Sequence, residues 1–379
     1  MKDLAAPSSA PVRFDPLLLC AVLSLVSLGL VMVYSASAVM AQDKLGDSLY
    51  FLNRQLMAAG MGVVAMAVGM KVGWRRLARL AYPLLLVTLV LLVLVLIPGI
   101  GTTAGGARRW IRFPGFGLQP AEVAKVAWVV YLSYSLAKKR EKVATFSVGF
   151  LPHLLLCGLL VGLSMLQPDF GSSVLLVFLL FALLFAAGTK VSYLVGSVLL
   201  ALPLAYAAIA TSPYRMKRVL AFLDPWAHRH DIGYQVAESL MSIGSGGLTG
   251  LGLGDGRQKL FFLPEAHTDF IFAIIGEELG LMGVVLLVSL YAIIIWRGIR
   301  ASLAAPEVFG TYLGLGLTSI VAFQATVNMC VAMGMLPTKG LTLPLMSYGG
   351  SGVLFNCVGL AILLRIDYEN RVLMRGGRP

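Results

Sequence analysis

Three titratable side chains gather in the run Leu-Pro-Glu-Ala-His-Thr-Asp-Phe, which ends where a long apolar stretch begins. They are Glu265, His267 and Asp269. A carboxylate at the mouth of an apolar helix bundle is partly desolvated, which raises its pKa and suits it to act as a general base. We therefore predict Asp269 to be a catalytic base, with Glu265 and His267 in supporting roles. The alternative is that Asp269 only caps the helix that follows it.

Arginines and glycines dominate the segment 99–118. Arg108 and Arg109 stand beside Trp110, with several glycines before and after them. Arginine binds phosphate through forked, charge-assisted hydrogen bonds, and glycine lets backbone amides approach a ligand closely. These residues are predicted to bind a lipid phosphate or pyrophosphate. The alternative is generic contact between an interfacial loop and lipid headgroups.

Two more charged residues, Glu122 and Lys125, stand three positions apart at the start of an apolar stretch, so they share one helix face. Charges at that depth in a membrane are costly and usually face a cavity or each other. We predict that both bind substrate and line the same cavity as Asp269. The alternative is a purely structural ion pair. Asp169 is predicted to cap a helix that starts near residue 171, or to support the site.

A segment rich in Pro and Gly near the C-terminus carries a further cation, Lys339, and then Ser347 in the run Ser-Tyr-Gly-Gly-Ser. Lys339 is predicted to contact the substrate, and Ser347 to support the site. Broken backbone at membrane depth must be buried in protein or line a wet cavity. An earlier glycine-rich stretch, 244–256, matches no nucleotide-binding pattern and is predicted to be a flexible turn between surface helices.

The elements that position these residues follow from the composition, because 58% of the 379 residues are hydrophobic and only 13% are charged. We predict an all-α integral membrane protein with about ten spans, arranged as one domain over 1–379. Both termini (1–15 and 366–379) are predicted to be cytoplasmic, and 211–269 is a long extracytoplasmic loop between spans seven and eight, carrying short surface helices. The spans are 16–35, 50–70, 77–97, 120–136, 148–166, 172–187, 192–210, 270–296, 311–333 and 343–364.

The net charge of +12 fits the positive-inside rule, because Lys and Arg cluster in alternate loops that would all lie in the cytoplasm. Nucleic acid is therefore excluded as a partner, and membrane lipids are expected. The four cysteines lie in apolar stretches without metal-ligand spacing. The residues indicate no particular cofactor. They do not show whether a metal ion is bound, and a divalent cation is an open alternative.

Six motifs resemble the SEDS family of shape, elongation, division and sporulation proteins, over nearly the whole chain. They are Gly-Ala-Arg-Arg-Trp-Ile (106–111), Gln-Pro-Ala-Glu-Val-Ala-Lys (119–125), Gln-Pro-Asp (167–169), Gly-Tyr-Gln (233–235), the run 263–272, and Ser-Tyr-Gly-Gly-Ser (347–351). The runs 213–219, 264–267 and 337–344 resemble the division branch more than the elongation branch. Gly105, Ala121 and Gly352 depart from the usual family residues, which puts local hydrogen bonds there in doubt.

The resemblance implies a peptidoglycan glycosyltransferase that polymerises lipid II into β-1,4 glycan strands by an inverting reaction, with undecaprenyl pyrophosphate leaving. It also implies a class B penicillin-binding protein and other divisome proteins as partners. The location would be the bacterial cytoplasmic membrane, at the division septum. Two rival functions are a lipid II flippase, which would need polar residues at mid-membrane, and a non-enzymatic divisome scaffold, which would not need Asp269.

Overall fold

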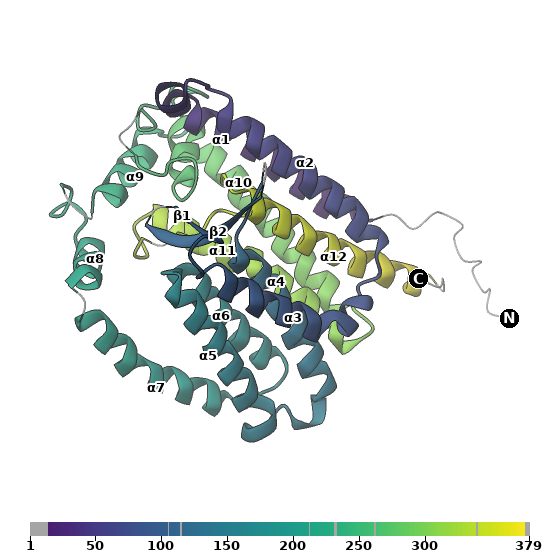
Figure 1. Cartoon of the computed structure of the whole chain (residues 1–379). Coiled ribbons are helices and arrows are strands. Elements are labelled where there is room, and N and C mark those ends of the chain that lie inside the picture. The colour runs from purple at the N-terminus through teal and green to yellow at the C-terminus, as the bar shows by residue number, and fades with distance from the viewer. Residues whose placement is uncertain are drawn as a thin grey trace.

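The computed structural model of the chain describes residues 14–104, 106–113, 116–211, 213–230, 233–260, 263–338 and 340–375. Each of the ten predicted spans overlaps a helix, and all of these helices except α7 (Val191–Ala210), which curves away, pack together in one bundle (Figure 1). These helices are α1 (Pro16–Leu45), α2 (Tyr50–Lys71), α3 (Arg76–Leu94), α4 (Pro120–Lys138), α5 (Leu151–Leu166), α6 (Phe170–Ala186), α7 (Val191–Ala210), α10 (Ile271–Leu303), α11 (Val308–Ala332) and α12 (Gly350–Met374). A 3-10 turn (Arg140–Lys142) and a π-helical turn (Phe146–Phe150) connect α4 to α5.

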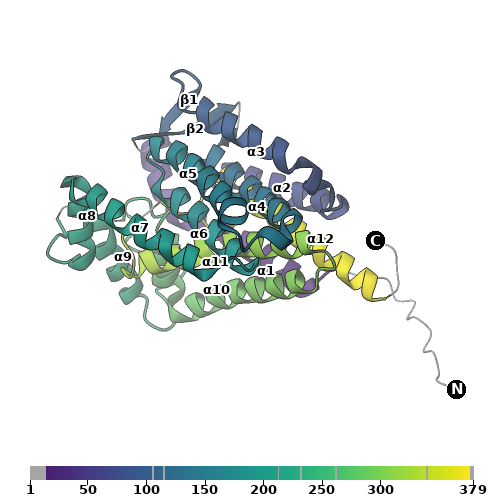
Figure 2. The same cartoon turned by 90° about the horizontal axis from the view of Figure 1, so that it is seen from below.

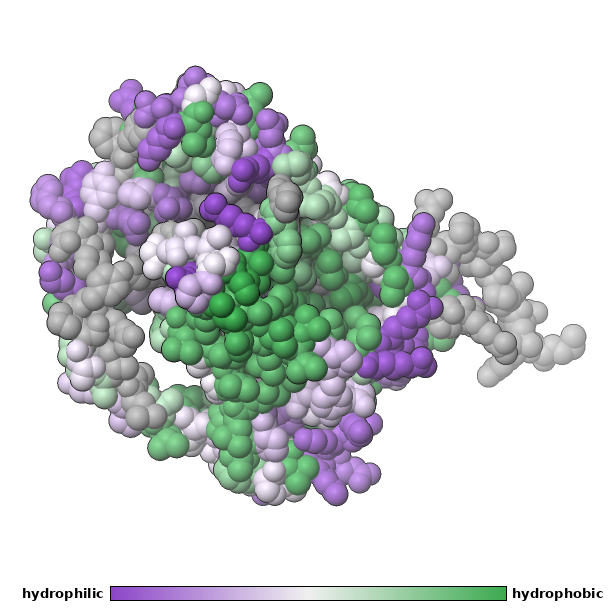
Figure 3. Space-filling model, viewed as in Figure 1, coloured by the Kyte–Doolittle hydropathy of each residue, from purple (hydrophilic) through white to green (hydrophobic). Residues whose placement is uncertain are grey.

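Seven of the described helices are long and apolar enough to cross a membrane: α1, α2, α3, α5 with the π-helical turn before it, α10, α11 and α12. Two shorter apolar helices, Phe170–Ala186 and Val191–Pro203, accompany them. Figure 3 shows a broad apolar surface lying between polar regions on the visible face of the bundle. The chain is therefore a multi-pass membrane protein, as predicted.

The chain is a helical membrane protein as predicted, apart from the segment 99–118, which contains a small antiparallel sheet that was not predicted. Its strands are β1 (Gly101–Ala104), β2 (Ala107–Phe113) and β3 (Phe116–Leu118), in the order β1-β2-β3. Thr102 pairs with Trp110, and Ile111 pairs with Leu118. Threonine, isoleucine and aromatic residues favour strands, and Gly106 supplies the positive φ of 78° that the first turn needs.

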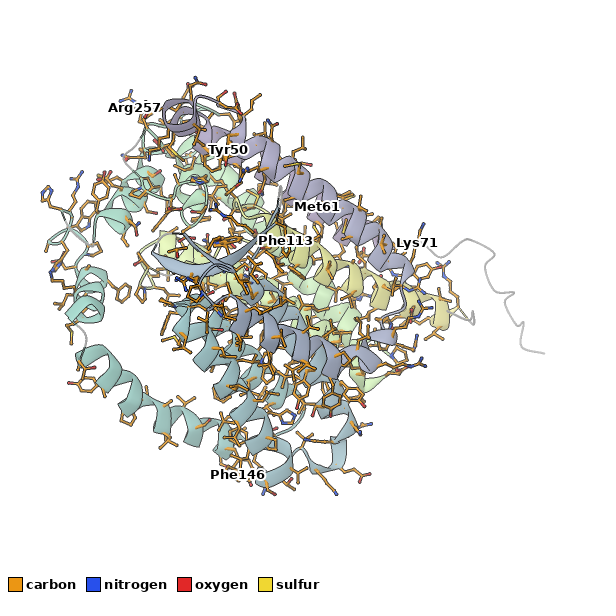
Figure 4. The ribbon with its side chains drawn as sticks, viewed as in Figure 1. Tyr50, Met61, Lys71, Phe113, Phe146 and Arg257 are labelled. Carbon is orange, nitrogen blue, oxygen red and sulfur yellow. The ribbon has the colours of Figure 1, made fainter. Side chains whose placement is uncertain are left out.

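Ion pairs fasten the first and last described residues to the same end of the bundle. Phe14 stacks on Tyr368 at 4.7 Å, and Asp15 pairs with Arg297 of α10 and with Arg371 of α12. The sheet lies away from this end in both views (Figures 1 and 2), and Figure 4 labels Tyr50 and Lys71 at the two ends of α2. We call the end that carries the sheet and residues 265–269 the site end.

The tenth predicted span starts later than expected, because α12 begins at Gly350 and not at 343. Pro344 cannot continue a helical hydrogen-bond ladder, and Leu345 has a positive φ of 66°. The irregular stretch 341–349 is nevertheless inside the protein, since Leu341, Leu343 and Met346 are almost fully buried. This agrees with the requirement that broken backbone in a membrane protein be enclosed.

The long segment 211–269 contains the two short helices that were predicted, α8 (Pro213–Leu223) and α9 (Tyr234–Ser245). The prediction of a flexible glycine-rich turn after α9 is wrong. Leu251 N and Gly252 N donate to Glu277 O and Glu278 O at 3.0 and 3.1 Å, so the turn is hydrogen-bonded to α10.

This contact coincides with a break in α10 at Gly280, whose φ of 63° and ψ of −162° are not helical. Beyond the break, Leu281 N and Met282 N donate to Gly247 O and Leu248 O. A Cβ atom on Gly280 would lie 2.3 Å from Gly250 N, so only glycine fits. The outer turns of α10 are thereby fixed to the long segment, directly after Asp269.

Candidate active site

Asp269 lies in a tight turn that ends one residue before α10 begins. The carbonyl oxygen of Glu265 accepts hydrogen bonds from the amides of Thr268, Asp269 and Phe270, at 3.1, 3.1 and 3.3 Å. Glu265 itself has a positive φ of 56°. The residue that caps α10 is Phe270, and no side chain caps this helix. The alternative that Asp269 serves as an ordinary helix cap is therefore wrong.

The stretch 341–349 holds this turn through backbone and hydroxyl contacts. Ser347 Oγ donates to Thr268 O at 2.6 Å and accepts from Leu343 N at 2.9 Å. Tyr348 N donates to His267 O at 2.9 Å. Ser347 thus fixes the backbone of Thr268, the residue next to Asp269.

Two buried amide side chains complete the support. Asn328 Nδ2 of α11 donates to Asp269 O and to Leu341 O, both at 2.8 Å. Gln55 of α2 donates to Ser347 O at 3.1 Å and accepts from Gly349 N at 3.2 Å. Neither side chain was singled out from the sequence. Both are polar residues inside apolar helices, and that was the available signal.

The Asp269 carboxyl is half-buried, and its surroundings favour the protonated form. Burial raises its pKa from 3.8 to about 7, and the nearby charges of Glu265 and Asp169 add to the effect. The guanidinium of Arg109 acts in the opposite direction and lowers the pKa. A carboxyl group that titrates near neutral pH is well suited to accept a proton during a reaction.

His267 lies against an aromatic group rather than in a metal site. Its ring is 4.7 Å from that of Phe51 and 5.7 Å from that of Tyr348. Burial lowers the pKa of His267, so the ring is neutral at pH 7, and Glu265 opposes this shift. Glu265 Oε2 accepts a 2.7 Å hydrogen bond from Thr268 Oγ1.

The two arginines of β2 use part of their hydrogen-bonding capacity on backbone carbonyls. Arg108 Nη1 donates to Leu96 O at 3.0 Å. Arg109 Nε donates to Gln167 O at 3.0 Å, and its Nη2 donates to Pro168 O. A guanidinium has five N–H donors, so donors beyond those in these bonds can reach an anionic ligand. Arg109 also joins the sheet to the turn before α6.

Asp169 caps α6, as predicted. Its side chain accepts from Ser172 N at 3.1 Å and from Ser172 Oγ at 2.8 Å. Gln119 Nε2, just before α4, approaches the same carboxylate at 3.4 Å. Asp169 is also near enough to Asp269 to raise its pKa, so the cap contributes to the charge around the site.

Glu122 and Lys125 of α4 form a buried ion pair, with Lys125 Nζ 2.5 Å from Glu122 Oε1. The pair lines a small, partly open pocket between α4, α11 and α12, together with Val321 and Asn356. Asp269 is not among the lining residues of this cavity, contrary to the prediction that they share one. Gly352 is next to both the ion pair and the stretch 341–349, since a Cβ on Gly352 would be 3.9 Å from both Glu122 Cδ and Thr342 Oγ1.

The predicted substrate contact Lys339 lies outside the described residues. Among the residues that are described, no three His, Cys, Asp or Glu side chains are grouped to hold a metal ion.

A second buried charge network lies on the first turns of α10, and its partners come from α1 and from residues 257–259. Glu278 pairs with Lys259 at 2.6 Å and accepts from Ser35 Oγ of α1 at 2.7 Å. Glu277 accepts instead from Arg257 N and Gln258 N, at 2.7 and 3.2 Å. The two carboxylates thus face different partners, as expected for neighbours on a helix.

The chain is similar in sequence to proteins of one known family. Residues 16–372 match the model of the FtsW, RodA and SpoVE cell cycle proteins. The chain belongs to this family. A relative from Geobacter metallireducens, named a probable peptidoglycan glycosyltransferase FtsW, is 47% identical over 355 residues, which cover 94% of this chain and 95% of the relative. The stage V sporulation protein E of Bacillus subtilis is 40% identical over 360 residues, covering 94% and 98%.

Solved structures of the FtsW/RodA/SpoVE fold agree with the architecture. A chain of a peptidoglycan synthase complex, described as coordinating polymerization and crosslinking, matches with a TM-score of 0.80 at 33% identity. The match covers 95% of this chain and 99% of that one. The rod shape determining protein RodA of Thermus thermophilus matches with a TM-score of 0.69 at 31% identity, covering 95% and 98%. The predicted SEDS membership is confirmed.

Proposed function

We propose that this chain is a peptidoglycan glycosyltransferase that polymerises lipid II during septal cell-wall synthesis. The observation that carries the proposal is Asp269, a carboxyl with its pKa raised to about 7, in a turn at the mouth of α10 that is held by α11 and by the stretch 341–349. The names of the relatives, several of them probable peptidoglycan glycosyltransferases, support the same activity.

The proposed reaction is a single displacement with inversion. Asp269 accepts the proton of the acceptor sugar hydroxyl, while that oxygen forms a bond to the anomeric carbon of the donor. The bond between this carbon and the pyrophosphate oxygen breaks, and undecaprenyl pyrophosphate leaves with the electron pair. Arg108, Arg109 and Lys339 stabilise the negative charge that develops on the leaving group. Glu122 and Lys125 bind another part of the lipid-linked substrate.

The membrane arrangement in this proposal has ten spans, with the site end outside the cell and both tails in the cytoplasm. The basic residues Arg75, Arg297, Arg365 and Arg371 would then face the cytoplasm, in accordance with the positive-inside rule. The proposed partners are a class B penicillin-binding protein, which would cross-link the new strands, and other divisome proteins. The synthase complex among the solved structures supports a stable association of this kind.

The proposal predicts how the rate depends on pH. The base must be deprotonated, so polymerisation should rise with pH through about 7 and level off above it, because the pKa of Asp269 is raised to about 7. The same shift means that the folded protein binds this proton more tightly than the unfolded chain. The contribution of Asp269 to stability therefore falls as pH rises from 3.8 to about 7.

The pH profile is measured as initial rate of glycan formation in the wild type and in Arg109→Ala. Arg109 lowers the pKa of Asp269, so its removal should move the midpoint of the profile to higher pH. A profile that is flat between pH 6 and 8 in both proteins, or an unmoved midpoint, would contradict the assignment of Asp269 as the titrating base.

Arg109 is also predicted to contribute to substrate affinity. Arg109→Ala should weaken lipid II binding by about 1.5–3 kcal/mol, the usual contribution of a charge-assisted hydrogen bond. Binding is measured by titrating labelled lipid II into the purified protein. Arg112→Ala, which removes an exposed arginine from the same strand, is the matched control and should change the affinity less. If Arg109→Ala lowers only the melting temperature, Arg109 serves only to hold the turn at Gln167 and Pro168.

The function itself is tested in vesicles that contain the chain and its partner transpeptidase, with labelled lipid II on one side. A polymerase converts the label into glycan on the side where the site end lies. A flippase would move the label across the membrane without forming glycan, and a scaffold would do neither. Transport without polymer would reject the proposal.

A further inference from the structure

Two amide side chains on α11 form a buried polar site to which the reaction assigns no role. Gln324 is 1% exposed and Asn328 is 2% exposed. Gln324 Nε2, Gln324 Oε1 and Asn328 Oδ1 are all buried, and none has a hydrogen-bond partner among the described residues. Three such atoms within two turns of one helix need an explanation, because buried polar groups are nearly always hydrogen-bonded to protein or to ordered water.

These side chains lie on one face of α11. Residues four apart on an α-helix share a face and are about 6 Å apart along the axis, so Gln324 lies one turn from Asn328. In the other direction, Val321 and Leu317 continue the same face, and both line the cavity that contains Glu122 and Lys125. Gln324 is therefore placed between that cavity and the residue that binds Asp269.

The chemistry of the unpaired atoms identifies the ligand. A glutamine amide supplies two donors and an acceptor, and Asn328 Oδ1 supplies a second acceptor. Asn328 Nδ2 is already engaged by Asp269 O and Leu341 O. A ligand here must be small, uncharged and able both to donate and to accept, which describes water. The pocket that Val321 and Leu317 line, farther along the same face of α11, contains the Glu122–Lys125 ion pair, and a polar pocket that admits a water-sized probe is suited to hold water.

We infer that Gln324 and Asn328 bind buried water that extends from the Glu122–Lys125 cavity to the anchor of Asp269, and that Gln324 is a positioning residue for this carboxylate. Water bonded to Asn328 Oδ1 fixes the rotation of the Asn328 amide. That rotation determines whether Nδ2 reaches both Asp269 O and Leu341 O. Gln324 touches neither substrate nor Asp269, so it acts only through this chain of contacts.

The first test compares Gln324→Leu with Thr318→Val in the full chain with its partner transpeptidase. Thr318 is a matched control because it is buried on the same helix, and its hydroxyl donates only to Gly314 O in that helix. Gln324→Leu should lower kcat by about tenfold or more with KM unchanged, since a small misplacement of a catalytic group costs one to two orders of magnitude in rate. The melting temperature is recorded for the same preparations, so that a loss of fold is distinguished from a loss of kcat. Thr318→Val should keep the wild-type kcat.

A wild-type kcat in folded Gln324→Leu would overturn the inference. The expected effect on kcat rests on the proposed function. A failure of the proposed function is recognised separately, because the wild-type protein would then make no glycan. The water itself is tested without any activity, in a high-resolution experimental structure of the wild-type complex. Ordered water within hydrogen-bond distance of Gln324 and of Asn328 Oδ1 is expected. A protein side chain there, or an empty apolar space, would overturn the inference even if Gln324→Leu cannot be purified.

Discussion

Replacing Asp269 with Asn should reduce the rate of lipid II polymerisation by about 10²–10⁴-fold, which is the usual contribution of a general base. Asparagine has the same shape as aspartate but cannot accept a proton at neutral pH. The hydrogen bonds that hold residue 269 use its backbone, namely its N–H to Glu265 O and its carbonyl to Asn328 Nδ2. The variant should therefore fold normally. It should also melt no lower than the wild type near pH 7, because it removes a carboxyl whose charged form is disfavoured by burial.

The measurement is the initial rate of glycan formation, with the melting temperature and partner binding recorded for the same preparation. Asp255→Asn is the matched control, because Asp255 is an exposed carboxylate in the same long segment. It should polymerise at the wild-type rate. If Asp269→Asn also polymerises within a few-fold of the wild type, the base is another group or no base is needed.

Removing one partner of the Glu122–Lys125 pair should have the largest effect on stability. Lys125→Met leaves the buried carboxylate of Glu122 without its cation, and such a change typically costs about 3–5 kcal/mol. Adding Glu122→Gln removes the uncompensated charge, so the double variant should recover most of the lost stability. The comparison is made by thermal unfolding of the two single variants and the double variant in the same detergent.

Polymer yield from the double variant then separates the two interpretations of the pair. If Glu122 and Lys125 bind substrate in their cavity, the double variant should be stable but should polymerise poorly. Wild-type stability together with wild-type yield would show that the pair is only structural. The control is Glu307→Gln, which removes the exposed carboxylate of the Arg75–Glu307 pair and leaves the Arg75–Glu369 pair in place; it should change neither stability nor yield appreciably.

The parts of the fold that depend on local patterns could be predicted from the sequence. The ten apolar runs correspond to ten helices, because a helix is the main way for a chain to hydrogen-bond its own backbone N–H and C=O groups in a membrane. The Glu122–Lys125 pair follows from helical spacing, and the Asp169 cap follows from its place before α6. The start of α12 could not be read from hydropathy, since residues 341–346 are apolar but are held in an irregular conformation by tertiary contacts.

The environment of Asp269 could be predicted only in part. Its place at the mouth of a span was evident, but its support comes from Gln55, Asn328 and Ser347, which are far from it in the sequence. Arg109 was predicted to bind phosphate, and its additional contact with Gln167 required the three-dimensional structure. The break at Gly280 was missed for the same reason, because its partner loop, 247–252, lies some 30 residues earlier in the chain.

The most direct test of the account is the release of undecaprenyl pyrophosphate, counted against the number of sugar linkages formed by the purified complex. Each inverting transfer breaks one bond to pyrophosphate and forms one glycosidic bond, so the account predicts one molecule released for each linkage, with release slowed by about 10²–10⁴-fold in Asp269→Asn. Lipid II that stays intact while the complex is folded and partner-bound, or release at the wild-type rate from Asp269→Asn, would contradict it.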